Sequence, residues 1–219
     1  MWNTLLFLLL PPNTILGPIT GGSYFKKEFN YNFFIRSFIF PFFYNISNFV
    51  INIRNFENIF ATDLLKTYLS KNIIKKSSFN FVLNGLETNV PIYNRKNIDF
   101  VIYFRKHNNK KNLYPINFIK KLIKHNLKIY VVGNKLNIKG INNLGYLSKK
   151  KLNEVLMKSK YSICSGENIY SLFTIDCMNN NVKVISNIKP NTSNKYFNSK
   201  LIYIKNFDNL KKDKISSFL

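Results

Sequence analysis

The sequence predicts an α/β fold with two Rossmann-like halves, of which the amino-terminal half is incomplete. From about residue 98 onward, short apolar segments alternate with helical patterns, which is typical of βαβ units around a parallel sheet. The chain has 46% hydrophobic residues, enough to bury a core. Residues 1–90 are rich in aromatic side chains, and the polar stretch 87–97 is typical of a linker. We therefore expect two domains, residues 1–90 and residues 91–219.

The amino-terminal half begins with an apolar run at residues 1–10. It is too short to span a bilayer, which takes about 20 residues, so we expect it to be buried in the fold. Residues 14–22 form an apolar run that enters a Gly/Pro loop, and residues 31–44 predict a helix interrupted at Pro41. Further elements are expected at residues 59–61 (strand), 64–69 (helix capped by Thr62 or Asp63) and 79–83 (strand closed by the Asn84-Gly85 turn).

The carboxyl-terminal half is more regular. Strands are expected at residues 100–104, 128–132, 161–164, 182–185 and 201–204, with a short element at 144–147. One helix begins at Pro115, the next is capped by Ser148, and a third follows the Ser165-Gly166 turn. Their apolar positions are Ile116, Ile119, Leu122 and Ile123, then Leu152, Val155 and Leu156, then Ile169, Leu172, Phe173 and Ile175. Ligands bind at the carboxyl ends of parallel strands, so the candidate loops begin at Arg105, Gly133, Ser165 and Ser186.

The formal net charge of +23 raises the question of a nucleic-acid or membrane partner. Nucleic-acid readers concentrate Arg, and here Arg occurs only at Arg36, Arg54, Arg95 and Arg105. We therefore expect no nucleic-acid partner. The two cysteines form no Cys-x-x-Cys pair, which indicates reduced thiols and a cytoplasmic location. The positive surface leaves open a peripheral contact with an anionic membrane at its inner face. Cys164 and Cys177 stand apart from any His/Cys cluster, so we expect neither a disulfide framework nor a metal.

The first candidate binding group directly follows the strand at residues 100–104. Arg105 with Lys110 or Lys111 could clamp a diphosphate, because a guanidinium fork suits phosphate oxygens. The alternative is a solvated basic loop, which is common in a Lys-rich chain.

A second group, Ser165, Gly166, Glu167 and Asn168, lies at a strand-to-helix junction. Free backbone N–H groups there can bind an anion, and a carboxylate or amide can accept sugar hydroxyls. Glu167 could equally be a favourable charge at the start of the helix. Further along, Asp176 could bind ribose hydroxyls or be an ordinary exposed helix residue.

The third group is the glycine-rich stretch at residues 17–22. Gly17, Gly21 and Gly22 allow a backbone to approach a ligand closely, and a tight structural turn is the alternative. The stretch lacks the Gly-Lys-Ser/Thr ending of a P-loop. His107 and His125 form no catalytic arrangement with a Ser, Cys or Asp.

Order and spacing together are more informative than any single group. The series is a strand, Arg105, Lys110, a strand ending in Gly133, Asn143-Leu-Gly-Tyr-Leu-Ser148, Glu167, and Ile175-Asp-Cys-Met178 before Val182-Lys-Val-Ile185. It resembles the donor-binding half of GT-B glycosyltransferases, close to the retaining GT4 type. Residues 17–22 are similar to the glycine-rich acceptor loop of that family, and residues 81–86 to the segment that ends its acceptor domain. The resemblance covers most of the chain.

The resemblance implies transfer of a sugar, with retention, from a nucleotide-sugar donor to a surface glycan or lipid-linked acceptor, without cofactor or metal. It puts Arg105 with Lys110 or Lys111 on the donor diphosphate and Glu167 or Asn168, the catalytic candidates, at the donor sugar. The remaining implied positions are Gly145, Tyr146 and Leu147 near the nucleobase, Asp176 at the ribose, Ser165, Gly166 and Ser171 on the donor side, and Gly17, Gly21 and Gly22 on the acceptor side.

The sequence departs from the family pattern in three places. Phe104 replaces the glycine before Arg105, the spacing from Glu167 to Asp176 is one residue longer, and the first half is about half the expected length. Two alternatives therefore stay open. One is a non-catalytic truncated homologue that binds a nucleotide or a partner, which an exposed apolar patch would support. The other is a basic nucleic-acid-binding protein, against which the even spread of Lys argues.

Overall fold

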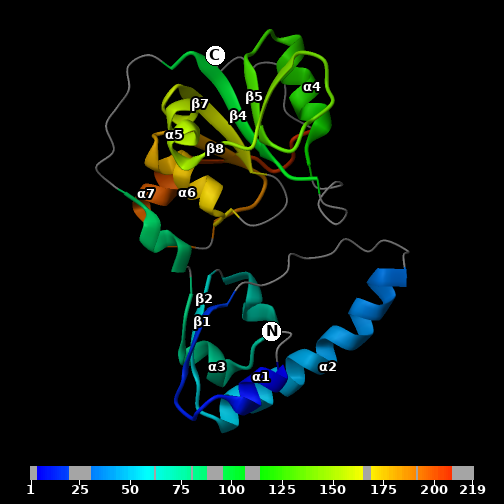
Figure 1. Ribbon diagram of the computed structural model, residues 1–219, viewed down its shortest axis with the longest axis vertical. Helices are drawn as coiled ribbons and strands as arrows, with labels where there is room; N and C mark the ends of the chain where they lie inside the picture. Colours follow the sequence, from blue (N-terminus) through cyan, green and yellow to red (C-terminus); the bar gives the residue numbers. More distant parts are fainter. Residues whose placement is uncertain are drawn as a thin grey trace. The chain divides into compact units, whose positions relative to one another are not determined.

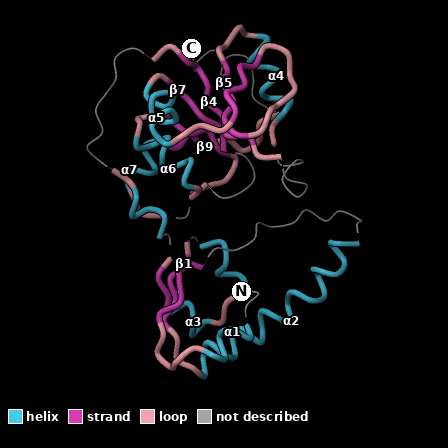
Figure 2. The backbone as a smooth tube through the Cα atoms, viewed as in Figure 1, coloured by secondary structure: helices cyan, strands magenta, loops and turns pink. Residues whose placement is uncertain are grey.

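The computed structural model describes residues 4–19, 31–61, 63–79, 81–87, 96–106, 114–164, 169–190 and 192–208. The chain divides into two compact units, Met1–Asn84 and Gly85–Leu219, which we call the first and second unit. Each unit carries a parallel β-sheet with helices beside it (Figures 1 and 2). The predicted α/β class with two parallel-sheet halves is therefore confirmed.

The first unit is built on a sheet of three parallel strands in the order β1-β2-β3. These strands are β1 (Ile15–Ile19), β2 (Glu57–Phe60) and β3 (Ser77–Ser78). The helices are α1 (Thr4–Leu9), α2 (Tyr31–Ile53) and α3 (Lys71–Lys75), with 3-10 helices η1 (Asp63–Tyr68) and η2 (Phe81–Gly85). Its core joins the helices to β2, with Ile51, Phe56, Phe60, Leu65 and Ile73 almost fully buried.

Two predictions for helices in the first unit were wrong. α2 continues through Pro41. A proline removes only one helical hydrogen bond, and burial of Val50 and Ile51 holds the later turns of the helix in place. The helix expected at residues 64–69 is the 3-10 helix η1, and the α-helix follows it, capped by Ser70. The expected burial of residues 1–10 is met only in part, since Phe7 belongs to the core and Leu10 packs against it, whereas Leu9 is 81% exposed.

The strand expected at residues 79–83 was also wrong. Pairing with β2 ends at Ser78, and the chain then turns into η2. Phe79 stacks on Phe60 with their ring centroids 5.1 Å apart, so its side chain contributes to the core without extending the sheet.

The second unit contains six parallel strands in the order β6-β5-β4-β7-β8-β9. They are β4 (Ile98–Phe104), β5 (Ile129–Gly133), β6 (Ile141–Gly145), β7 (Ser159–Cys164), β8 (Lys183–Ser186) and β9 (Leu201–Tyr203). Counted from β4 as the first strand, this is the Rossmann order 3-2-1-4-5-6. All six fall at or next to the segments that the sequence predicts.

Helices cover both faces of this sheet. α4 (Ile116–Lys124) links β4 to β5, whereas α5 (Lys149–Met157), α6 (Leu172–Asn179) and α7 (Lys195–Lys200) follow β6, β7 and β8. From β4 the chain adds strands toward β6, and from β7 it adds strands toward β9, at the other edge of the sheet. Right-handed crossovers therefore put α4 on one face of the sheet and α5, α6 and α7 on the other face (Figure 1). α4 buries Phe118 as well as the predicted Ile119 and Leu122. α7 was not predicted from the sequence.

Candidate functional site

The strand order identifies one place in the second unit where a ligand is expected. β4 and β7 are neighbours, and the connections from them run to opposite sides of the sheet. A crevice forms at the carboxyl ends of two such strands, which is where open α/β sheets bind ligands. Arg105 directly follows β4, and the predicted group of residues 165–168 directly follows β7. Of the two predicted groups, Arg105 therefore adjoins this switch point, whereas residues 165–168 lie outside the described residues.

Backbone contacts fix the chain on the β4 side of the switch point. The Asn134 N–H donates to the Phe104 carbonyl at 2.8 Å, and the Asn134 side-chain oxygen accepts from the Lys106 N–H at 2.9 Å. Gly133 has a φ of +97°, and a Cβ there would lie 2.5 Å from the Phe104 carbonyl oxygen. A glycine is thus required where β5 passes the end of β4.

Arg105 is exposed, between two residues whose backbones make these contacts. Within the described residues, no hydrogen bond or ion pair occupies its guanidinium. A fixed backbone with an unengaged fork of donors is suited to capture of a phosphate group from solution. The other predicted phosphate ligands, Lys110 and Lys111, lie outside the described residues.

The predicted nucleobase position lies at the end of β6. Gly145 has a φ of +71°, and a Cβ there would meet no atom within 4 Å. Tyr146 is 72% exposed, and Leu147 is half-buried. Open space beside an exposed aromatic ring is suited to binding of a planar base. This position at the end of β6 is two strands away from β4 in the sheet.

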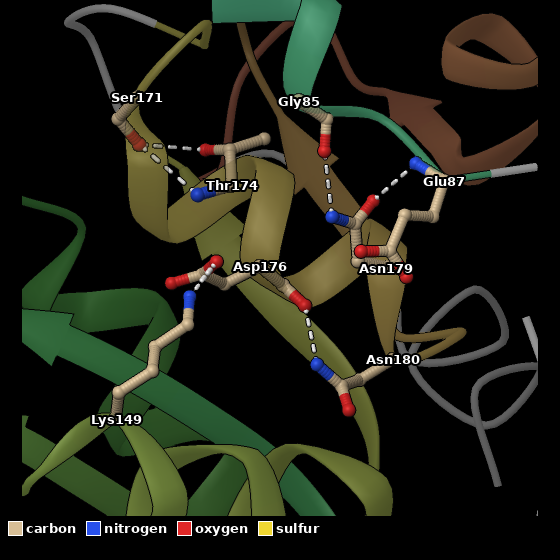
Figure 3. A network of polar contacts seen from close by, with 8 residues as sticks. All are labelled: Gly85, Glu87, Lys149, Ser171, Thr174, Asp176, Asn179 and Asn180. Carbon is tan, nitrogen blue, oxygen red and sulfur yellow. Dashed lines mark hydrogen bonds and ion pairs between the residues drawn. The ribbon is translucent and has the colours of Figure 1, made fainter.

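Asp176 lies within α6 and forms an ion pair with Lys149, the first residue of α5 (Figure 3). The side chain of Asp176 is only 18% exposed, whereas that of Lys149 is 65% exposed. The alternative of an ordinary exposed helix residue is therefore wrong. A ribose at this carboxylate would share it with the Lys149 ammonium group.

Ser171 caps the amino terminus of α6. Its hydroxyl oxygen accepts from the Thr174 N–H at 3.2 Å and lies 2.9 Å from the Thr174 hydroxyl oxygen (Figure 3). Ser171 thus orients the helix that follows β7. The predicted catalytic residues Glu167 and Asn168, with Ser165 and Gly166, lie outside the described residues.

Comparison with known proteins gives a weak structural likeness. No protein-family model matches the chain, and no curated protein matches it. Among solved structures, the chain is similar to E. coli heptosyltransferase WaaC with ADP, at 11% identity and a TM-score of 0.37, over 57% of this chain and 43% of that one. The same enzyme with ADP-2-deoxy-2-fluoro heptose gives 12% identity and a TM-score of 0.36, over 63% and 45% of the two chains. The chain thus spans less than half the length of these structures, and the retaining GT4 type stays a prediction.

The predicted acceptor glycines belong to the first unit. Gly17 lies inside β1 rather than in a loop or turn, and a Cβ there would lie 2.7 Å from the carbonyl oxygen and Cβ of Ile59. The close approach that the glycine permits is to strand β2. Gly21 and Gly22 lie outside the described residues.

A polar network at the carboxyl terminus of α6 was missed by sequence reasoning. The Asn179 amide donates to the Gly85 carbonyl at 2.7 Å and accepts from the Glu87 N–H at 2.9 Å (Figure 3). Lys96 donates to the Asn181 carbonyl at 2.6 Å, where a cation complements the helix dipole. Burial, and then the like charge of Lys200, lower the pKa of Lys96 to about 8. Only the run of three asparagines, residues 179–181, could have drawn attention to this end.

The first unit also holds an open groove of about 410 Å³. Tyr44 and Tyr68 stack beside it with ring centroids 4.6 Å apart, and Asn48 bridges Tyr68 and Ser70 through its amide. Burial, and then Tyr68, raise the pKa of Tyr44. No titratable side chain other than these tyrosines lines the groove, so it lacks the cations that a phosphate ligand needs.

Two features are absent from the described residues. No group of three or more His, Cys, Asp or Glu side chains could hold a metal ion there. In that same part of the chain, every helix is too short or too polar to cross a bilayer.

Proposed function

We propose that the second unit binds the diphosphate of a nucleotide-sugar at the β4–β7 switch point, and that the chain is a glycosyltransferase. It transfers the sugar, with retention, to a surface glycan or lipid-linked acceptor. The observation that carries the proposal is the unengaged guanidinium of Arg105 at the carboxyl end of β4, on a backbone held by Asn134. We further propose a cytoplasmic location, with peripheral contact at the inner membrane face through the chain's positive charge.

In this proposal the chemistry depends on the departing diphosphate. Cleavage of the sugar–phosphate bond leaves negative charge on the diphosphate, and Arg105 with Lys110 or Lys111 stabilises that charge. Glu167 or Asn168 faces the donor sugar. The base stacks on Tyr146 above Gly145, and the ribose hydroxyls donate to the Asp176 carboxylate, which is paired with Lys149. This arrangement needs no metal.

The test is a thermal-shift series with UDP-, GDP- and ADP-sugars on the wild-type chain and on Arg105→Ala. Lys183→Ala is the matched control, because Lys183 is an exposed cation at the opposite, amino-terminal end of β8. We expect one donor to stabilise the wild type and Lys183→Ala, and to lose most of its effect on Arg105→Ala. A folded wild type that no nucleotide-sugar stabilises contradicts the proposal.

A second candidate is a partner-binding module, and one observation favours it. Phe38, Phe42, Phe49 and Ile53 of α2 are 74%, 63%, 65% and 66% exposed. Their spacing puts them along one side of the helix, so they form an apolar stripe. Stripes of this kind on soluble proteins mark interaction surfaces.

Multi-angle light scattering on the wild type and on the double variant Phe42→Ser/Phe49→Ser tests this candidate. We expect the wild type to self-associate and the double variant to be monomeric. Identical monomeric profiles would leave the second candidate without support.

A further inference from the structure

We infer that Tyr114 is a ligand-binding residue at the switch point, where its hydroxyl donates a hydrogen bond to a phosphate oxygen of the bound nucleotide. This inference rests on the proposed function and adds a residue that the sequence did not single out.

Tyr114 lies at the end of one of the two central strands. It precedes Pro115, where α4 begins, and its ring packs on Phe104, the last residue of β4, with the centroids 5.0 Å apart. Phe104 ends β4, one of the two strands of the switch point, and Arg105 follows it directly in the chain. The ring thus lies beside the carboxyl end of β4.

The hydroxyl at this position has no hydrogen-bond partner among the described residues, although its oxygen is buried. A buried polar group without a partner costs free energy, so nearly all such groups in native proteins have one. Asn58 has the other unpartnered buried oxygen of the described residues, but its amide nitrogen donates to the Phe56 carbonyl at 3.1 Å. Tyr114 therefore has the one buried side chain in this part of the chain whose only polar group is unpaired.

The surroundings hold this side chain in place. The Tyr114 carbonyl accepts from the Ile116 N–H at 2.8 Å, and the ring packs against the core of the second unit. The buried oxygen has no partner in the described part of the free chain, so a ligand must displace the atoms that cover it in order to bond there. Binding then recovers the cost of the unpaired group.

The protonation state favours an anionic partner. Burial, and then Cys164, raise the pKa of Tyr114, so the phenol stays neutral and keeps its proton at physiological pH. A neutral phenol is a donor, and phosphate oxygens are acceptors. Arg105 supplies charged donors from the adjoining loop, so the two residues offer complementary contacts to one phosphate group.

The test measures binding of UDP, ADP, GDP and inorganic pyrophosphate by isothermal titration calorimetry, and thermal stability of the free chain. It compares the wild type with Tyr114→Phe and with Tyr203→Phe. Tyr203 is the matched control because its side chain is 47% exposed on the edge strand β9. We expect Tyr114→Phe to raise Kd about 10- to 100-fold, as for a lost hydrogen bond to a charged group, and Tyr203→Phe to bind as the wild type does.

The stability measurement distinguishes a binding role from a structural one. An unpaired hydroxyl predicts that free Tyr114→Phe melts at the wild-type temperature or above it. A clear loss of stability would show that the hydroxyl is paired in the free chain and would overturn the inference.

The binding results separate this inference from the proposed function. Binding that Arg105→Ala weakens and Tyr114→Phe leaves unchanged overturns the role of Tyr114 alone. A wild type that binds neither pyrophosphate nor any of the nucleotides overturns both.

Discussion

Lys149 and Asp176 join the start of α5 to the middle of α6 by an ion pair across 27 residues of sequence (Figure 3). The two helices follow β6 and β7, so the pair links the proposed base and ribose positions. Lys149 is largely exposed, and an exposed ion pair contributes little to folding. Its main effect is to direct the Asp176 carboxylate toward α5.

The first prediction follows from this pair. Asp176→Asn should weaken binding of a nucleoside diphosphate about tenfold, because a ribose hydroxyl loses a charged acceptor. Binding of inorganic pyrophosphate, which has no ribose, should be unchanged. Isothermal titration calorimetry with both ligands measures this. Lys149→Met is the control for the lost ion pair and should lower the free energy of unfolding by at most about 1 kcal/mol. Equal weakening of both ligands by Asp176→Asn would remove Asp176 from the ribose site.

The second prediction concerns two glycines at strand ends. Both Gly133 and Gly145 have positive φ, so alanine is strained at either position, by about 1 kcal/mol. At Gly133 the new Cβ would also meet the Phe104 carbonyl oxygen, whereas at Gly145 it would enter open space. Gly133→Ala should therefore lower the free energy of unfolding by about 3 kcal/mol or more, and Gly145→Ala by about 1 kcal/mol. Urea denaturation of the two variants measures the difference, and equal losses would contradict the clash.

The sheet of the second unit could be predicted because its central strands are buried on both faces. Phe100, Val101 and Ile102 of β4 are all fully buried, so the sequence shows a continuous apolar run. β3 could not be predicted, since Ser77 and Ser78 have no strand preference and are held only by pairing with β2. The predicted interruption at Pro41 was wrong because the packing of α2 outweighed the helix-breaking tendency of proline.

Candidate site residues could be proposed from the sequence where they directly follow a strand. Arg105 could be identified because it directly follows a readable strand. Asn134 could not, because its contact with Lys106 joins residues 28 positions apart. Nothing in the sequence distinguishes Tyr114 from other aromatic residues, and only the burial of its unpaired hydroxyl does so. Such contacts depend on the folded arrangement and leave no periodic signal in the sequence.

The third prediction concerns Asn179, whose side chain holds the chain where it enters the second unit. Asn179→Ala removes the bonds to the Gly85 carbonyl and the Glu87 N–H, and should lower the free energy of unfolding by about 1–2 kcal/mol. It should also speed proteolysis near residues 85–87, where local opening becomes easier. Asn198→Ala is the control, because its amide bonds only to the nearby Thr192 carbonyl. Equal cleavage rates for the two variants would show that Asn179 does not anchor this segment.

The fourth prediction is a pH dependence due to Lys96. Burial, and then Lys200, lower the pKa of Lys96 to about 8 in the folded chain, against 10.5 for a free lysine. Between these values the unfolded chain binds more protons than the folded one, so the contribution of Lys96 to stability rises with pH from about 8 to about 10.5. Below pH 8 both states are protonated and the cost of the buried charge is fully present.

Urea denaturation of the wild type and Lys96→Met at pH 7.5, 8.5 and 9.5 isolates this contribution. The stability of the wild type relative to Lys96→Met should increase across the series. Lys200→Gln removes the like charge and should shift the increase toward higher pH. A difference between wild type and Lys96→Met that stays constant with pH would mean that the folded chain leaves the Lys96 pKa near its free value, because the carbonyls of Asn180 and Asn181 that accept from its ammonium group offset the burial.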